Sequence, residues 1–269
     1  MTSTSEDSVA KSKSVAGAQP KRQQPVIAID GPAGAGKSTL AAHLARRFGF
    51  LNLETGAMYR ALALKAIEND FAFDEEAPLL DLATRTTIKL EPQIEGNRVL
   101  LDGIDVSRRV RDTDVTNAAS KISIHRNLRA WMVGQQRALG EAGGVVMEGR
   151  DIGTAVFPDA EVKIFLDAAP EVRGNRRYRQ AVPSGEPSGQ PTERQNSTRQ
   201  SPDPLSSEQQ RAVEEATLRD LKERDYRDRN RAESPLQPAS DAIILDSTSL
   251  TLEEVLAQAE IIVRSHVGA

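Results

Sequence analysis

The stretch GPAGAGKST, residues 31–39, constrains the fold more than any other part of the chain. It follows the apolar run VIAID and leads into the amphipathic stretch TLAAHLARRFG, so that the pattern G-x-x-x-x-G-K-[ST] lies between an expected strand and an expected helix. Glycines at this spacing let backbone N–H groups turn inward around phosphate oxygens, and the helix adds its positive amino end. We expect a nucleoside triphosphate here, with Lys37 at the β- and γ-phosphates and Ser38 on Mg²⁺. The expected ATP-binding residues are Gly31, Pro32, Ala33, Gly34, Ala35, Gly36, Lys37, Ser38 and Thr39.

Apolar runs alternate with helix-like segments along most of the chain. Continuous apolar runs are typical of strands buried on both faces of a parallel sheet. Such alternation predicts an α/β protein of the P-loop NTPase fold, with a five-stranded parallel sheet covered by helices on both faces. The expected strands are residues 26–30, 51–54, 145–148, 162–167 and 242–246, and the expected helices are 37–49, 56–69, 112–140, 170–180, 207–231 and 251–265.

Three segments depart from this alternation. Residues 87–110 alternate apolar and polar side chains around two glycine turns, which predicts a small antiparallel unit inside an insert over 82–125 that is partly helical at its ends. The polar residues 1–24 are expected to be a disordered tail, and the proline-rich residues 183–204 a flexible insertion. We therefore expect a core of 25–81 and 126–269, an acceptor-binding insert of 82–125 and a lid region of 170–231.

Composition excludes several classes of function. The chain of 269 residues has no cysteine, so it lacks disulfides and thiolate metal sites, which fits the cytoplasm. Its net charge of −4 disfavours a nucleic-acid polymer as partner. No run reaches the roughly 18 apolar residues that span a membrane, so no membrane partner is expected.

Arginines after several of the expected strands indicate what receives the phosphoryl group. The chain lacks the Asn-Lys-x-Asp tetrapeptide of a signalling GTPase, and Arg150 directly follows the strand that ends at Glu148, where a second anion fits better than water. A kinase for a small acceptor must bring two polyanions together and so needs arginines from several directions. Further arginines lie in the segments 173–177 and 222–231, although the second segment also matches a solvated helix face with salt bridges.

Several longer strings resemble one family, the bacterial cytidylate kinases, over about 26–180 and 207–265. They are IDGPAGAGKSTLA, ETGAMYRALAL, LDGIDVSRRVR, NAASKIS, EGRDIGTAVFPDAEVKIFLDA, ERDYRDRNRA and PLQPASDAIILDST. The resemblance implies transfer of the γ-phosphoryl group of MgATP to CMP or dCMP by a monomer. It leaves open the preference between CMP and dCMP, the choice of ATP or GTP as donor, and the role of the insertion and the tail.

The resemblance also implies a role for individual side chains. Thr55, Tyr59 and Arg60 line the acceptor site, with Arg60 on the CMP phosphate. Ser120, Arg129 and Asp151 read the cytosine, whose N4 amino group suits a carboxylate acceptor and whose N3 and O2 suit hydroxyl and guanidinium donors. The implied contacts on phosphate are Arg150 and Arg224, those on the sugar side are Asp228 and Arg231, and the lid arginine near the donor is Arg176; with Lys37, the arginines 150, 176 and 224 form the expected catalytic set.

Two alternatives to a CMP kinase stay open at this point. The first is a kinase for another small acceptor, such as UMP or a metabolite that is not a nucleotide. The second is a nucleotide-sensing module that binds without turnover, against which the full arginine set beside Lys37 argues. Glu54 and Glu148 stand where the family usually carries aspartate, so each carboxylate reaches one methylene further toward the expected Mg²⁺.

Overall fold

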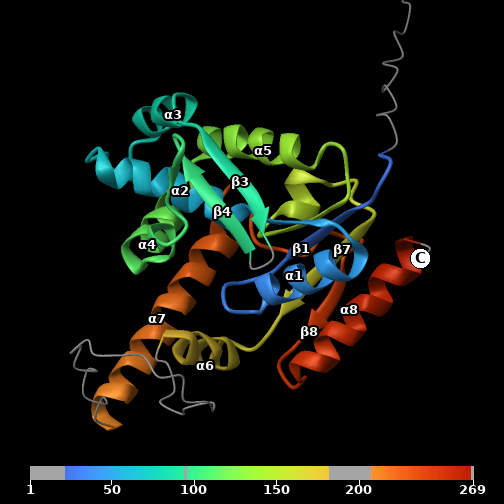
Figure 1. Cartoon of the computed structure of the whole chain (residues 1–269). Coiled ribbons are helices and arrows are strands. Elements are labelled where there is room, and N and C mark those ends of the chain that lie inside the picture. The colour runs from blue at the N-terminus through green and yellow to red at the C-terminus, as the bar shows by residue number, and fades with distance from the viewer. Residues whose placement is uncertain (1–21, 94–95, 182–206, 268–269) are drawn as a thin grey trace, which may run out of the picture.

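The computed structural model describes residues 22–93, 96–181 and 207–267 as alternating strands and helices. A five-stranded parallel sheet forms the centre, in the order β2-β6-β1-β7-β8 (Figure 1). Its strands are β2 (Leu51–Glu54), β6 (Val145–Gly149), β1 (Val26–Asp30), β7 (Val162–Asp167) and β8 (Ile243–Asp246). The predicted parallel sheet is therefore confirmed, and in this order the carboxyl end of β1 lies between those of β6 and β7.

Alternate residues of β1 enter two separate cores. Ile27 and Ile29 pack with α1 (Lys37–Phe48) and α8 (Leu252–Val267) on one face, whereas Val26 and Ala28 belong to the core on the other face. Because successive strand side chains point to opposite faces, one fully buried strand serves both layers. The second core includes residues of α2 (Thr55–Glu68), α3 (Glu76–Thr84), α4 (Thr113–Ile122) and α5 (Arg126–Gly140).

The expected antiparallel unit is present beside this second core. It consists of β3 (Ile88–Gln93), β4 (Gly96–Leu101) and β5 (Ile104–Asp105), and a short 3₁₀ turn, η1 (Arg109–Arg111), leads from it to α4. The expected start of the insert at residue 82 falls within α3, a helix that the sequence patterns did not predict. Pro78 looks like a helix breaker there, but it lies in the first turn of α3, where proline is tolerated.

One predicted helix is wrong in its extent. The expected helix over 112–140 is two helices, because α4 ends at Ile122 and α5 begins at Arg126. The Ser123 hydroxyl donates to the Ser120 carbonyl, and a ring nitrogen of His125 bonds to the Phe73 carbonyl, so both side chains hold the intervening turn. The short-range bond of Ser123 is of a kind that competes with continuation of a helix, whereas the bond of His125 ties the turn to a distant part of the chain.

The helices α6 (Pro170–Ala181) and α7 (Ser207–Asn230) cross at one end of the sheet (Figure 1). α6 follows β7, and α7 runs from α6 toward α4. The 183–204 insertion lies outside the described residues, as do 1–21 of the expected tail. Arg22, within that tail, ion-pairs with Asp159 at 2.6 Å and lies over the ring of Phe157.

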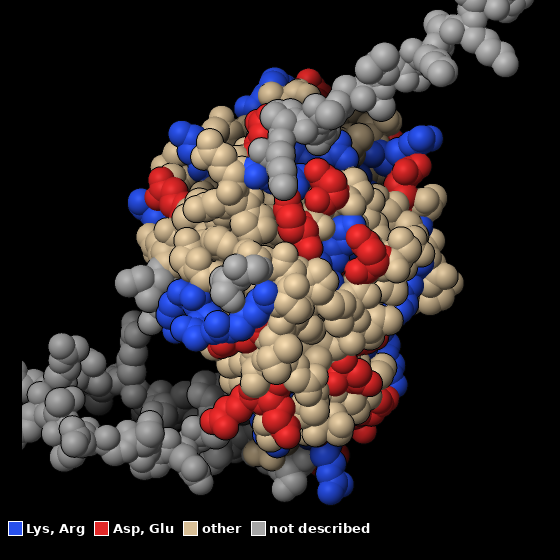
Figure 2. Space-filling model, turned by 90° about the vertical axis from the view of Figure 1, so that its right-hand side faces the viewer, with Lys and Arg blue, Asp and Glu red and all other residues tan. Residues whose placement is uncertain are grey.

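Two features of the described residues concern possible large partners. None of their helices has the length and apolar content needed to cross a membrane. On the face in Figure 2, lysine and arginine side chains lie beside aspartate and glutamate side chains over much of the described surface. That face therefore does not resemble the continuous basic surface that binds a polyanion.

Candidate active site

The loop between β1 and α1 has the backbone that its glycines predict. Gly31, Gly34 and Gly36 have φ of 147°, 76° and 102°, a region that other residues rarely adopt. At Gly31 an added Cβ would lie 2.0 Å from the Leu166 carbonyl oxygen of β7, so no larger residue fits. The close approach of β7 and the amino end of α1 together shape a site for phosphate.

Lys37 lies at the start of α1 and is buried, with its Nζ donating to the Pro32 carbonyl at 2.8 Å. Burial and then the nearby Arg150 lower its pKa to about 7, although Glu148 and Asp30 act in the opposite direction. An anion placed beside this amine would favour its charged form. A phosphate bound beside Lys37 would therefore raise the pKa of the amine and be stabilised by its positive charge.

Three side chains are candidates to contact the expected Mg²⁺: Glu54 of β2, Glu148 of β6 and Ser38 after the phosphate loop. Ser38 is exposed and its hydroxyl hydrogen-bonds to Glu148, whose Oε1 is buried with no hydrogen-bond partner among the described residues. Burial and the neighbouring Glu54 raise the pKa of Glu148 to about 7. The described residues contain no group of three or more histidine, aspartate or glutamate side chains that would hold a metal by themselves. A hydroxyl and one carboxylate suit Mg²⁺, which takes its other ligands from substrate phosphates and water.

Positive charges converge on the same end of the sheet without enough counter-charge. Arg150 follows β6, Arg177 lies on α6, and Arg224 lies on α7. Burial, then Arg177 and Arg150, lower the pKa of Arg224 to about 10, and its Nε has no hydrogen-bond partner in the described structure. Because like charges are held together here, an anion bound among them would be stabilised strongly.

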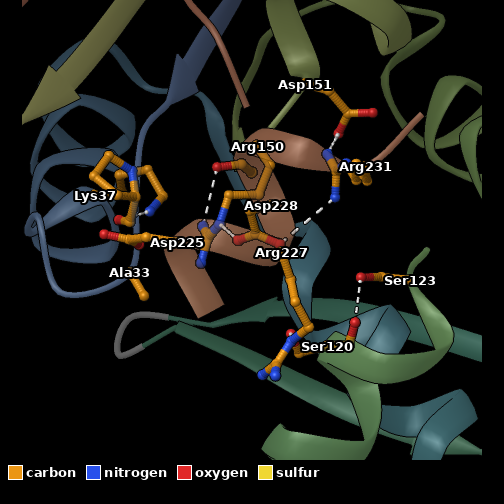
Figure 3. Close-up of polar contacts among 12 residues, drawn as sticks. Ala33, Lys37, Ser120, Ser123, Arg150, Asp151, Asp225, Arg227, Asp228 and Arg231 are labelled. Carbon is orange, nitrogen blue, oxygen red and sulfur yellow. Dashed lines mark hydrogen bonds and ion pairs between the residues drawn. The ribbon is translucent and has the colours of Figure 1, made fainter. Parts of the chain in front are cut away.

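A ring of polar contacts, the polar ring, contains several of the residues expected to bind the acceptor, and Figure 3 shows part of it. Starting at α7, Arg231 lies 3.8 Å from Asp228 and 4.0 Å from Asp151, and Asp151 forms a buried ion pair with Arg129 of α5. Arg150 joins the ring from β6, since its Nε donates to Asp228 at 2.9 Å. Six of the predicted acceptor residues thus belong to this ring or contact it: Arg129, Arg150, Asp151, Asp228, Arg231 and Ser120.

The ring closes through α4. Arg129 Nη1 donates to the Ser123 carbonyl at 3.0 Å, and the Ser123 hydroxyl donates to the Ser120 carbonyl at 3.0 Å. The Ser120 hydroxyl then accepts from Nε of Arg227, at 3.1 Å, which returns the ring to α7 (Figure 3). Ser123 is a ring member that the sequence patterns did not indicate, and Arg227 is one to which they gave no role in the site. Arg227 stands three residues after Arg224 and four before Arg231, a spacing that shares a helix face and was the one available signal.

Donors inside the ring lack acceptors. The hydroxyl of Tyr59, Nε of Arg129 and Nη2 of Arg231 are buried with no hydrogen-bond partner among the described residues. Buried polar groups are normally paired, so unpaired donors gathered at one place indicate a ligand rich in acceptors. Tyr59 also lies below the Arg129 guanidinium, 5.6 Å from ring centre to Cζ, and burial raises its pKa to about 12.

The remaining predicted residues lie near the ring but hold protein partners. The Thr55 hydroxyl is buried and donates to the Glu148 carbonyl at 2.7 Å. Arg60 pairs with Glu54 at 2.5 Å. Arg176 reaches from α6 to the carbonyl of Ala35 in the phosphate loop, at 3.2 Å, and so stands on the donor side.

Asp30, the last residue of β1, joins the phosphate loop to the turn beside Asp151, a residue expected to contact the base. Its carboxylate accepts from the N–H groups of Ile152 and Gly153, both at 2.7 Å, in the short π-helical turn η2 (Ile152–Val156). Asp151 immediately precedes this turn. One buried carboxylate therefore fixes the position of Asp151 relative to the loop.

The fold and the site define a class of protein. A parallel sheet of this order, a glycine loop that leads into a helix, a buried lysine at its start and converging arginines are the parts of a P-loop kinase. The family model of cytidylate kinase matches residues 27–201 and 191–265. The chain belongs to the cytidylate kinase family, and it is a kinase.

Several curated relatives carry that name. The cytidylate kinase of Aeromonas salmonicida (strain A449) is 44% identical over 87% of this chain and 91% of its own length. That of Solibacter usitatus (strain Ellin6076) is 44% identical over 93% of this chain and 97% of its own. A solved shikimate kinase from Acinetobacter baumannii aligns at a TM-score of 0.37 and 15% identity over 91% of this chain and 93% of that one, too distant to carry an argument.

Proposed function

We propose that the chain transfers the γ-phosphoryl group of MgATP to CMP or dCMP, giving CDP or dCDP. The observation that carries the proposal is the gathering of Lys37, Arg150 and Arg224 at the carboxyl end of the sheet, where burial and then neighbouring arginines lower the pKa of Lys37 and of Arg224. Two phosphate groups brought together would supply the missing negative charge. Family membership and the names of the relatives supply the acceptor.

The acceptor phosphate is already an anion near neutral pH, so its oxygen can attack without a general base. The protein then contributes position and electrostatic stabilisation. Lys37 and the loop N–H groups hold the donor phosphates, while Arg150 and Arg224 stabilise the charge that spreads over the transferred group. Mg²⁺, held by Ser38 with Glu148 beside it, would neutralise charge on the donor phosphates. Arg176 would approach the donor from α6.

The proposed base reading follows from the donor and acceptor pattern of cytosine. Asp151 accepts from the N4 amino group, and Ser120 and Arg129 donate to N3 and O2. Asp228 and Arg231 serve the sugar side, and Tyr59, Thr55 and Arg60 complete the acceptor site. Uracil presents an oxygen in place of the amino group and an N–H in place of N3, so it would leave buried polar groups unpaired, which gives strong discrimination. By family resemblance we also propose that the protein is a monomer and that it works in the cytoplasm. Sedimentation analysis tests whether it is a monomer.

Phosphate transfer from MgATP to CMP, dCMP, UMP and AMP, measured in parallel, tests the function. We expect CMP and dCMP to be good acceptors and UMP and AMP to be poor. Asp151→Asn keeps an acceptor for Arg129 but offers an amide N–H to the base. It should therefore lower the preference for CMP over UMP by about 100-fold or more. Discrimination between substrates that differ in a polar group is about 10²–10⁵. Asp81→Ala, on an exposed part of α3, is the matched control. Equal rates with CMP and UMP in the wild type would refute the assignment of the acceptor.

A further inference from the structure

Arg227 of α7 has a position that the family resemblance does not explain. Its Nε donates to the Ser120 hydroxyl at 3.1 Å, and its Nη1 pairs with Glu223 one turn earlier on α7. Its side chain is about three-quarters buried, at 24% exposed. The Arg227 guanidinium therefore has one partner on α4 and one on α7, and it does not extend into solvent.

The hydrogen bond between Arg227 and Ser120 is one of two that join the same faces of α7 and α4. Arg224, three residues before Arg227, donates to the Asn117 side chain, three residues before Ser120. Residues three apart lie on one face of a helix. α7 and α4 are therefore joined by two parallel hydrogen bonds between side chains 107 positions apart in the sequence.

A serine hydroxyl can act as a donor or as an acceptor, and its neighbours decide which. It has one O–H proton and two lone pairs, and it rotates to suit its partners. A cationic N–H that points at the oxygen occupies one lone pair and repels the hydroxyl proton. The proton of Ser120 then points away from Arg227. The Ser123 hydroxyl donates to the Ser120 carbonyl and not to the Ser120 hydroxyl. The proton of the Ser120 hydroxyl therefore remains available for a ligand.

We propose that Arg227 is a positioning residue that holds the Ser120 hydroxyl as a hydrogen-bond donor toward the acceptor base and so contributes to the choice of cytosine over uracil. The proposal rests on the function proposed above and deepens it. Cytosine N3 is an acceptor that matches this donor, whereas uracil carries a proton at N3 that opposes it. A serine free to rotate would accept from uracil nearly as well as it donates to cytosine.

The polar ring gives a second reason why this orientation matters. The other free groups in the ring, on Tyr59, Arg129 and Arg231, are donors or can donate. With Ser120 also fixed as a donor, the set presents donors to the ligand and leaves acceptance to the carboxylates of Asp151 and Asp228. A base edge with two acceptors and one amino group fits that set.

The test is the ratio of kcat/KM for CMP to kcat/KM for UMP, measured for the wild type, Arg227→Met, Ser120→Ala and the double variant. We expect Arg227→Met to lower this ratio about five- to tenfold, the size of one hydrogen bond, mainly through KM for CMP. Ser120→Ala should lower it similarly, and the double variant should show no further loss because both changes remove one interaction. Arg227→Lys, which retains a cationic donor, should recover at least half of the logarithmic loss. Arg229→Met, at an exposed position on the same helix, is the matched control and should leave the ratio unchanged.

Two results would overturn the proposal. The first is an unchanged ratio in Arg227→Met; if kcat/KM then falls equally for CMP and UMP, Arg227 acts on the phosphate or in the fold. The second is additive effects in the double variant. If Arg227→Met does not fold by circular dichroism, Arg227→Leu, which also lacks a donor, takes its place with the same expectations. Failure of the proposed function is distinguishable, because the wild type itself would then transfer no phosphate to CMP. In that case the ratio of the dissociation constants of CMP and UMP is measured in place of the ratio of kcat/KM. A wild type that binds CMP and UMP equally would refute both the cytosine-reading site and the role of Arg227 in it.

Discussion

Arg173 offers the most direct test of how the site is held together. It is 2% exposed, and its guanidinium has three partners: Asp225 of α7 at 2.6 Å, the Ala168 carbonyl at 2.8 Å and the Ala33 carbonyl of the phosphate loop at 3.0 Å. Arg173→Met removes all three bonds and leaves Asp225 buried, with one oxygen that already lacks a partner. Removing one partner of a buried ion pair costs about 3–5 kcal/mol. That is a large share of the roughly 5–15 kcal/mol that holds a typical domain folded.

Urea unfolding followed by circular dichroism would measure this loss. We expect the free energy of unfolding to fall by about 3–5 kcal/mol in Arg173→Met, and the double variant Arg173→Met/Asp225→Leu to recover at least half of it, because no uncompensated charge remains. Arg229→Met is the control: its ion pair with Asp167 is 3.6 Å long and 45% exposed on the arginine side, so the change should be below about 1 kcal/mol. A loss below 1 kcal/mol in Arg173→Met, or no recovery in the double variant, would refute the reasoning.

Three further predictions concern single side chains of the site. Burial raises the folded-state pKa of Asp30 to about 6 from 3.8, so its favourable contribution is complete below 3.8 and is lost as pH rises through 6. The free energy of unfolding of Asp30→Asn, relative to wild type, should therefore increase by about 3 kcal/mol between pH 3.5 and 7.5 in urea titrations, and a difference that is constant with pH would contradict this. Tyr59→Phe removes a buried hydroxyl without a partner, so unfolding should cost about 1 kcal/mol more, while KM for CMP rises; a destabilised variant would show that the hydroxyl is paired. Lys37→Met should lower kcat about 100-fold or more with the fold intact, and a kcat within tenfold of wild type would remove Lys37 from catalysis.

The elements of the core could be predicted from local patterns because their causes are local. Residues 26–29, VIAI, are continuously apolar, as expected of a strand buried on both faces, and the loop after β1 needs glycines at fixed spacing. α3 was missed because Pro78 reads as a breaker unless its place in the first turn is known. The break after Ile122 depends on the Phe73 carbonyl, a contact made 52 positions from His125.

The parts of the site that depend on distant contacts could not be predicted. The resemblance named Ser120 and the arginine-rich helix, but the pairing of Ser120 with Arg227 spans 107 residues. Arg173 is one of several arginines in the segment 173–177, and the sequence pattern does not show which of them is buried, yet Arg173 is among the most buried side chains. Periodicity shows which residues share a face, whereas only the packed fold shows what that face meets.

The position of α7 has a consequence for how the two substrates influence each other. Through Asp225 the helix is tied by Arg173 to the loop that would hold the donor, and through Asp228 and Arg227 it is tied to the acceptor side. These three residues lie within one turn of the helix. A shift of the loop and a shift of the polar ring therefore act on the same turn of α7. Donor and acceptor binding are then linked thermodynamically, and each substrate should raise the affinity of the other by the same factor.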